Sequence, residues 1–332
     1  MNDQHKYAEA AFYHMEGDKV RCFLCPHACL LKEGASGICG VRSFLDGKLR
    51  STVYGYPAAI QIDPVEKKPL YHFLPGSRTF SIGTQGCNLS CLFCQNWDLL
   101  TRHVHHGPKT DPGYIVEKAI ETDCASIAFT YNEPIVFAEY AMAIRDIASE
   151  HDLPCILVSN GFISPQARKE LYSGIRAVNI DLKAFSDEIY STYCGGKLMP
   201  VLDTITYCIE KGIHTEITTL LIPGVNDNES ILKKEFSWII ENCGKNTPLH
   251  LSAFHPDHKM MDHPSTSGSS LERAKQTALE CGLNYIYIGN YPGFDNSTVC
   301  PECGKTVIER RSGRIKANVH HEHNIPIICS IE

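Results

Sequence analysis

The middle of the chain alternates short apolar runs with stretches whose apolar residues recur at helical spacing. The short runs read as buried strands, and the longer stretches between several of them read as amphipathic helices. We expect strands at residues 79–84, 126–131, 155–159, 177–182, 214–222 and 249–254. We expect helices at residues 135–151, 165–173, 230–243 and 271–281.

This βαβα order predicts an α/β fold in which parallel strands are joined by right-handed helical crossovers and ligands bind at the carboxyl ends of the strands. Six units suit an open, partial (β/α)6 barrel better than a closed eightfold one, and a doubly wound sheet is the alternative. We assign residues 76–295 to the barrel. Residues 1–75 form a Cys-rich N-terminal extension, and residues 296–332 form a C-terminal Cys/His segment that resembles a degenerate zinc ribbon.

Composition limits the function classes. The chain has 332 residues, of which 43% are hydrophobic, so it can bury a large core. Its net charge of -7 argues against a general nucleic-acid binder, and no run of about eighteen apolar residues is present to span a bilayer. Sixteen cysteines without a secretory leader indicate a reducing compartment, where thiols bind metals. We therefore expect a cytoplasmic protein that binds neither nucleic acid nor membrane.

The most informative motif is the triplet Cys87, Cys91 and Cys94, spaced C-x3-C-x2-C directly after the first predicted strand. Three thiolates on one short loop can bind one face of a cubane iron-sulfur cluster and leave one iron open. An open metal position indicates a site of chemistry, because a small molecule can bind there. The alternative is a zinc knuckle, which the triplet disfavours because zinc sites usually show paired cysteine hooks.

With Phe93 in the aromatic position, this run resembles the signature of the radical S-adenosylmethionine (SAM) superfamily. The resemblance implies a (β/α)6 partial barrel, a 4Fe-4S cluster held by the three cysteines, and SAM bound to the open iron through its amino and carboxylate groups. It also implies that an electron from the reduced cluster cleaves a C-S bond of SAM and releases a carbon radical.

Polar residues follow the ends of several predicted strands, as a site at the barrel's upper face requires. Any one of them alone is as often a surface residue or helix cap, but together they favour a SAM site. Asn132 and Glu133 lie where the superfamily often has a Gly-Gly-Glu run that receives the SAM amino group. Resemblance to glycyl-radical-enzyme activases implies that Asp181 and Lys183 contribute an acid and a base to SAM binding. The predicted SAM contacts are Asn132, Glu133, Ser159, Asn160, Asp181, Lys183 and His255.

Two further cysteine groups flank the barrel. Four thiols within some twenty residues, with Gly-rich turns between them, suit a closed zinc or second iron-sulfur site. The C-terminal hook is half of a zinc ribbon, so it forms a mixed Cys/His site, completes the N-terminal site, or has decayed. The N-terminal candidates are Cys22, Cys25, Cys29 and Cys39; the C-terminal hook is Cys300 and Cys303, for which Cys329, His320, His321 and His323 are the remaining ligands.

The combined motifs resemble the radical SAM component of the AmmeMemoRadiSam system. They are the N-terminal cysteine block, residues 63–72, 94–97 and 130–134, and Cys300-Pro-Glu-Cys303-Gly304. This resemblance implies companions similar to the AMMECR and Memo families, and a reductant such as ferredoxin or flavodoxin. Two other classes remain in view: a multi-cluster electron-transfer or metal-scaffold protein without SAM turnover, and a zinc-ribbon interaction module. The open iron disfavours the first, and the long βα core disfavours the second.

Overall fold

A computed structural model describes residues 7–100, 108–311, 314–317, 323 and 325–329. Its centre is an eight-stranded sheet whose strand order is β14-β13-β12-β11-β10-β9-β8-β7. The pairings from β8 to β14 are all parallel, and β7 pairs antiparallel with β8. The strands are β7 (Ala59–Pro64), β8 (Arg78–Gly83), β9 (Ser126–Phe129), β10 (Cys155–Ser159), β11 (Ile175–Asp181), β12 (His214–Leu221), β13 (Leu249–Ala253) and β14 (Ile286–Gly289).

Helices connect successive parallel strands. Because the strand order follows the sequence, right-handed crossovers place these helices on one side of the sheet, which excludes a doubly wound arrangement. The described strands at the two edges, β7 and β14, do not pair with each other, so the barrel is open, as predicted. The crossover helices are α1 (Pro112–Glu121), α2 (Ala138–Ser149), α3 (Pro165–Leu171), α5 (Met199–Glu210), α6 (Glu229–Cys243) and α7 (Gly268–Cys281).

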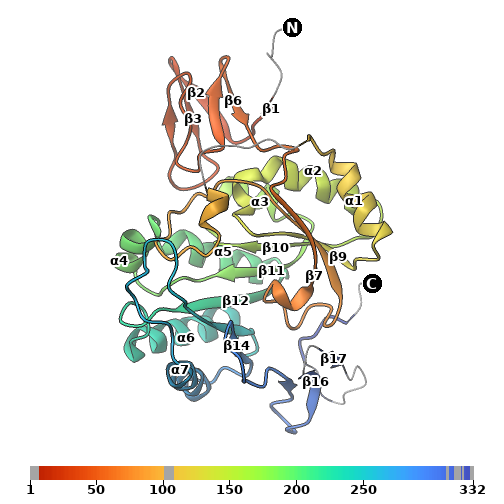
Figure 1. Cartoon of the computed structure of the whole chain (residues 1–332), viewed down its shortest axis with the longest axis vertical. Coiled ribbons are helices and arrows are strands. Elements are labelled where there is room, and N and C mark those ends of the chain that lie inside the picture. The colour runs from red at the N-terminus through yellow and green to blue at the C-terminus, as the bar shows by residue number, and fades with distance from the viewer. Residues whose placement is uncertain (1–6, 101–107, 312–313, 318–322, 324, 330–332) are drawn as a thin grey trace.

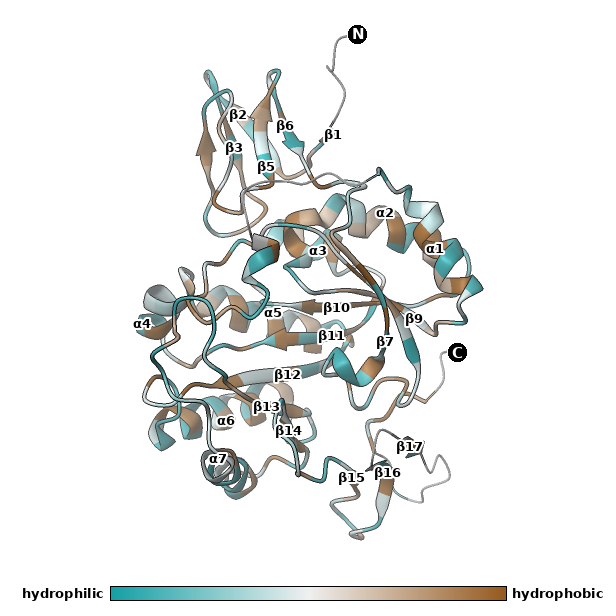
Figure 2. Cartoon of the chain, in the orientation of Figure 1, coloured by the Kyte–Doolittle hydropathy of each residue, from teal (hydrophilic) through white to brown (hydrophobic). Residues whose placement is uncertain are grey.

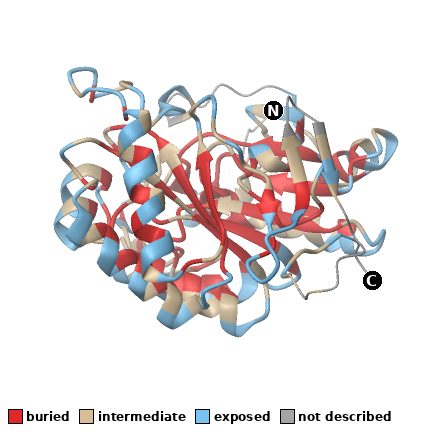
Figure 3. Ribbon diagram, turned by 90° about the horizontal axis from the view of Figure 1, so that it is seen from below, coloured by how far each residue is buried: buried red, intermediate tan, exposed pale blue. Residues whose placement is uncertain are grey.

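Local sequence explains where these helices begin. Asp111 and Ser164 accept hydrogen bonds from the backbone of the first turns of α1 and α3, and a proline follows each of them. A side-chain acceptor at the N-cap and proline at the first helical position are both favourable, because the first turn leaves its N–H groups without partners inside the helix. Figure 3 shows the buried strands at the centre, with the helices exposing their outer faces.

The sequence prediction missed several elements. Residues 286–289 form β14, which was not predicted. Residues 59–64 form β7, which extends the barrel sheet beyond β8. β7 falls within residues 1–75, the predicted N-terminal extension, so the barrel sheet begins before residue 76. Helices α1 and α5 were also not anticipated. Conversely, the predicted strand 126–131 ends as β9 at Phe129, because Tyr131 has a left-handed φ of 72°.

Residues before β7 form two small antiparallel sheets. One contains β1 (Ala8–Glu9), β6 (Lys48–Ser51) and β5 (Arg42–Leu45), and the other contains β2 (Tyr13–Glu16), β3 (Lys19–Cys22) and β4 (Leu30–Leu31). We call these two sheets and their loops the N-terminal module. At the C-terminus, β15 (Thr298–Val299), β16 (Thr306–Arg311) and β17 (Arg314–Ala317) form a third small sheet. The N-terminal module and this C-terminal sheet lie at opposite ends of the molecule (Figure 1).

The end of the barrel where the strands begin is closed by residues 69–73. The buried carboxylate of Glu216 accepts hydrogen bonds from the backbone N–H groups of Tyr71 and His72 at 2.9 and 2.8 Å. It is also paired with the rings of His214 and His250. Figure 2 shows that hydrophobic residues run through the central strands β10 and β11. Ligands therefore reach the barrel from its other end. None of the helices in the described part of the chain is long and apolar enough to cross a bilayer.

Candidate functional site

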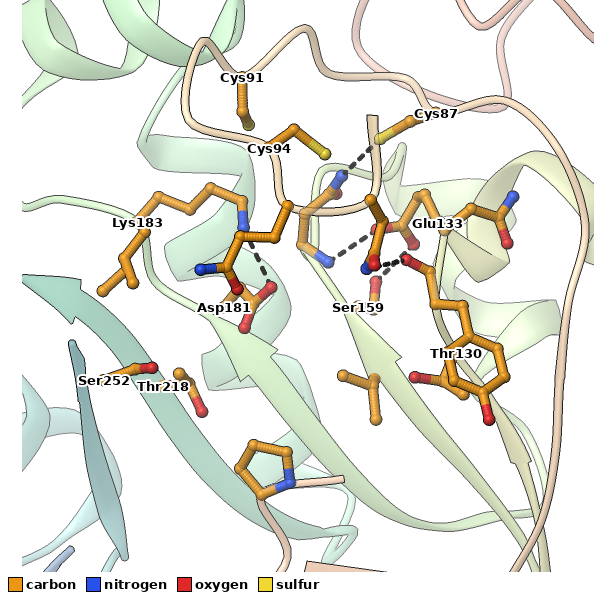
Figure 4. A pocket seen from close by; sticks show the side chains of 18 of the residues that line it. Cys87, Cys91, Cys94, Thr130, Glu133, Ser159, Asp181, Lys183, Thr218 and Ser252 are labelled. Carbon is orange, nitrogen blue, oxygen red and sulfur yellow. Dashed lines mark hydrogen bonds and ion pairs between the residues drawn. The ribbon is translucent and has the colours of Figure 1, made fainter. Parts of the chain in front are cut away.

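A cavity of about 460 Å³ lies at the carboxyl ends of the strands (Figure 4). This volume is in the range of small-molecule sites. The lining includes all three cysteines of the triplet and six of the seven predicted SAM contacts, although these residues come from four separate segments of the chain. These lining residues are Cys87, Cys91, Cys94, Asn132, Glu133, Ser159, Asn160, Asp181 and Lys183.

The three cysteines lie on the loop that follows β8, and they face the cavity from one side (Figure 4). Their three sulfurs do not all lie within 4.8 Å of one another. Among the described residues, the group of three ligands that meets this distance is Cys300, Cys303 and His323. Four thiolates around one zinc ion would lie about 3.8 Å apart, given a Zn–S bond of about 2.3 Å. A cubane is larger than a single ion and holds its thiolates further apart. The triplet therefore lacks the close spacing of a preformed zinc site.

Asn132 holds the start of the cysteine loop. Its Oδ1 accepts a hydrogen bond from the backbone N–H of Thr84 at 2.9 Å. Its Nδ2 lies within hydrogen-bond distance of Thr84 Oγ1, and of the carbonyl oxygens of Gln85 and Gly86 at 3.1 and 2.8 Å. These contacts engage both the oxygen and the nitrogen of the Asn132 side chain with residues 84–86, so this residue positions the cluster loop.

Glu133 and its neighbours on β10 form a second buried network. One carboxylate oxygen of Glu133 accepts hydrogen bonds from Ser159 Oγ at 2.7 Å and the Ile135 N–H at 3.1 Å. The other oxygen accepts the Asn160 N–H at 2.7 Å. Burial raises the pKa of Glu133 to about 7, against the lowering effect of these three donors. Asn160 then extends the network to the cysteine loop, since its Nδ2 donates to Asn88 Oδ1 at 2.9 Å and lies 3.8 Å from the Cys87 sulfur.

Asp181 and Lys183 present the charged part of this site. Lys183 Nζ lies 3.0 Å from Asp181 Oδ2, and the two side chains are 16% and 34% exposed. Burial lowers the pKa of Lys183, but the carboxylate of Asp181 and the nearby sulfurs of Cys91 and Cys194 together raise it more strongly, so the net pKa lies well above the usual value. The pair thus offers a permanent cation and an anion to a ligand beside the three cysteines.

His255 does not join the other predicted contacts. It is exposed, and its Nε2 lies 3.0 Å from the carbonyl oxygen of Asn290. It is absent from the described residues that line the cavity, where β13 contributes Ser252 instead. Thr218 on β12 also lines the cavity, whereas Glu216 lies at the closed end of the barrel.

Sequence reasoning missed a charged group on the opposite wall. Asp63 at the end of β7 pairs with the buried amine of Lys68 at 2.7 Å, and Tyr131 donates its hydroxyl hydrogen to the same carboxylate at 2.5 Å. Lys68 Nζ also lies 4.4 Å from the centre of the Tyr131 ring. All three residues line the cavity. The charged run from residue 63 to 68 was visible in the sequence, but nothing there indicated that it would line the same cavity as the cysteines.

The two accessory cysteine groups have different geometries. Cys300, Cys303 and His323 bring their ligand atoms within 4.8 Å of one another, as a mixed Cys/His zinc site requires. His320 and His321 lie outside the described residues. The four N-terminal cysteines line a separate cavity, which does not include the C-terminal hook. Because the two groups lie at opposite ends of the molecule, the hook does not complete the N-terminal site (Figure 1).

Comparison with known proteins agrees with this site. Residues 81–233, which include the cysteine loop and the strand ends up to β12, match the Radical SAM superfamily. The uncharacterized protein MJ0808 of Methanocaldococcus jannaschii is 40% identical over 306 residues, 91% of each chain. A GTP 3',8-cyclase of Peptoclostridium acidaminophilum is 28% identical over 152 residues, which are 44% of this chain and 47% of the cyclase.

Among solved structures, a radical SAM methyltransferase from Sphaerobacter thermophilus superposes with a TM-score of 0.51. The sequence identity is 17%, and the superposition covers 66% of this chain and 68% of the methyltransferase, so it supports the fold alone. Residues 81–233 form a Radical SAM superfamily domain. Members of that superfamily use a 4Fe-4S cluster and SAM, and the three cavity-facing cysteines are the residues that would hold such a cluster here.

Proposed function

We propose that this chain is a radical SAM enzyme that abstracts a hydrogen atom from a substrate held in the 460 Å³ cavity. The observation that carries the proposal is the convergence of three cysteines and the Asp181–Lys183 pair on one cavity. When bound, the cluster and SAM supply one-electron cleavage of a C-S bond of SAM, which yields methionine and a 5'-deoxyadenosyl radical that takes the hydrogen atom.

The chain's own residues orient the cosubstrate and keep the loop in place. Lys183 carries the positive charge that suits the carboxylate of SAM, and Asp181 suits its positively charged end. Asn132 and Asn160 hold the cysteine loop at both sides of Cys87, as their hydrogen bonds to Gly86 and Asn88 indicate. A fixed loop keeps the reacting groups in one geometry, and that preorganisation lowers the barrier.

The group formed by Asp63, Lys68 and Tyr131 lines the same cavity. A buried carboxylate and amine on this wall suit a polar substrate with an ionised group. A glycine backbone on another protein, as in the activases, and a polar small molecule are both compatible with such a wall. The AmmeMemoRadiSam assignment, with AMMECR-like and Memo-like companions and a ferredoxin or flavodoxin as reductant in the cytoplasm, rests on the sequence motifs and is part of this proposal.

The test is SAM cleavage by the anaerobically purified protein. After reconstitution with iron and sulfide and one-electron reduction, we expect 5'-deoxyadenosine and methionine in equal amounts, measured by chromatography with mass detection. The Cys91→Ala variant is expected to lose both the SAM-sensitive cluster signal and the products. Cys281→Ala, at a partly exposed cysteine on α7 away from the cavity, is the matched control and keeps both. An intact, reduced cluster that leaves SAM uncleaved would instead favour an electron-transfer protein.

A further inference from the structure

The N-terminal module contains a second cavity that the proposed reaction does not use. Four cysteines line it: one from β3, two from the connection between β3 and β4, and one from the loop before β5. Its remaining wall is mostly apolar and includes Leu24, Ile38 and Val136. All four thiols are free of disulfides. The four cysteines are Cys22, Cys25, Cys29 and Cys39.

The spacing of these sulfurs argues against a zinc ion. No three of the four lie within 4.8 Å of one another, although the Cys300, Cys303 and His323 group of the same described chain does. All four cysteines line one cavity, and two of their sulfurs lie close to one point in it, because a Cβ on Gly37 would lie 3.6 Å from the Cys29 sulfur and 3.8 Å from the Cys39 sulfur. Four thiols that line one cavity are the ligand set that a fully ligated iron-sulfur cluster uses.

Charge in the cavity wall agrees with an anionic occupant. Arg42 lines the cavity and is 1% exposed. Its guanidinium pairs with Glu139 at 2.7 Å and donates to the carbonyl oxygen of Ala11. Its Nε is buried and has no hydrogen-bond partner among the described residues. A cluster held by four thiolates is a net anion, so a buried cation beside it is favourable and an unused N–H donor gains an acceptor.

The second cavity adjoins the loop of the SAM site. Asn88, the residue after Cys87, lines it, and His27 Nε2 lies 2.8 Å from the Asn88 carbonyl oxygen. A Cβ on Gly86 would lie only 2.5 Å from the carbonyl oxygen of Cys39, so the two loops are in direct backbone contact. Ile38, which also lines the cavity, is 53% exposed. The cavity thus borders both an exposed residue and the loop of the cysteine triplet.

We propose that Cys22, Cys25, Cys29 and Cys39 hold a second, fully ligated iron-sulfur cluster that passes single electrons from the molecular surface to the SAM-binding cluster. In each transfer the second cluster loses one electron and the SAM-binding cluster gains it, and a low-potential one-electron donor such as a reduced flavodoxin or ferredoxin restores the first. The existence of the second cluster does not depend on the proposed radical SAM reaction. The electron transfer to the SAM-binding cluster does depend on that proposed function.

Iron content and spectroscopy of the full chain test the site without reference to activity. After anaerobic reconstitution we expect about eight irons per chain in the wild type, and about four in a Cys87→Ala/Cys91→Ala/Cys94→Ala variant, since each cubane contains four. The electron paramagnetic resonance signal that remains in this variant after reduction is unaffected by SAM. The Cys22→Ala/Cys39→Ala variant shows the converse: about four irons and a SAM-sensitive signal. Cys281→Ala keeps the wild-type values.

About four irons in the wild type, or zinc in the N-terminal site, would overturn the proposal even if SAM is cleaved normally. A loss of SAM cleavage with eight irons present would instead reject the proposed function and leave the second cluster standing. For the relay, the Cys22→Ala/Cys39→Ala variant should form 5'-deoxyadenosine at least tenfold more slowly than the wild type with reduced flavodoxin, but at an equal rate with titanium(III) citrate. Equal rates with both donors would show that the second cluster carries no electrons to SAM.

Discussion

Gly86 sits where the N-terminal module meets the cysteine loop, and its replacement by alanine has a calculable cost. Its φ of 84° is in the left-handed region, where an L-residue loses about 1 kcal/mol or somewhat more. The added Cβ would also lie 2.5 Å from the Cys39 carbonyl oxygen and 2.7 Å from a methyl group of Val41. Because one obstacle is backbone, the loops must separate, which costs about a further 1–3 kcal/mol. Gly86→Ala is therefore expected to lower the free energy of unfolding by about 2–4 kcal/mol.

Gly34→Ala is the matched control. Gly34 has a φ of 80°, but a Cβ added there would meet nothing within 4 Å, so Gly34→Ala loses stability through backbone strain alone. We expect the urea midpoint of Gly34→Ala to fall slightly and that of Gly86→Ala to fall at least twice as far, with fluorescence and circular dichroism as probes. Equal midpoints for the two variants would refute the claim that the module and the cysteine loop are in backbone contact.

Three further outcomes follow from single side chains. Asn132→Ala removes the hydrogen bonds that one amide oxygen and two amide hydrogens make to residues 84–86, worth about 0.5–1.5 kcal/mol each, so iron should pass to a chelator at least tenfold faster than from the wild type. An unchanged rate would contradict the loop-holding role. Lys183→Met should weaken SAM binding by about ten- to a hundredfold in calorimetry at unchanged iron content, since a charged hydrogen bond contributes about 1.5–3 kcal/mol. Burial raises the pKa of Glu235 to about 8, so this carboxyl stays protonated in the folded protein while the unfolded chain ionises near 4.5. Its contribution to stability is complete below pH 4.5 and is lost as the pH rises to about 8. Relative to Glu235→Gln, the wild type should lose up to about 5 kcal/mol over that range, and parallel pH profiles would refute the assignment.

The sequence alone determined the features that depend on local spacing. Three cysteines within eight residues identify a loop that can bind a cluster, because so short a loop constrains its thiols in nearly any fold. The alternation of strand and helix patterns identified an open α/β barrel, and parallel topology then required the strand-end residues to meet at one face. That rule placed Asp181 and Lys183 correctly beside the cysteines.

Only the tertiary structure decided what those residues contact. In the sequence, Asn132 and Glu133 look like ligands for an ammonium group. In the structure, Asn132 is hydrogen-bonded to residues 46 to 48 positions away, and Glu133 to Ser159, 26 positions away, and to Ile135. Asp63 and Lys68 face the cavity because β7 joins the sheet beside β8, a pairing that no periodicity reveals. His255 follows β13 as predicted but points to Asn290, since the direction of a side chain beyond a strand end depends on the loop that packs there. Local spacing thus specifies which chemistry is available, while hydrogen bonds and packing between distant segments select which side chains remain free to perform it.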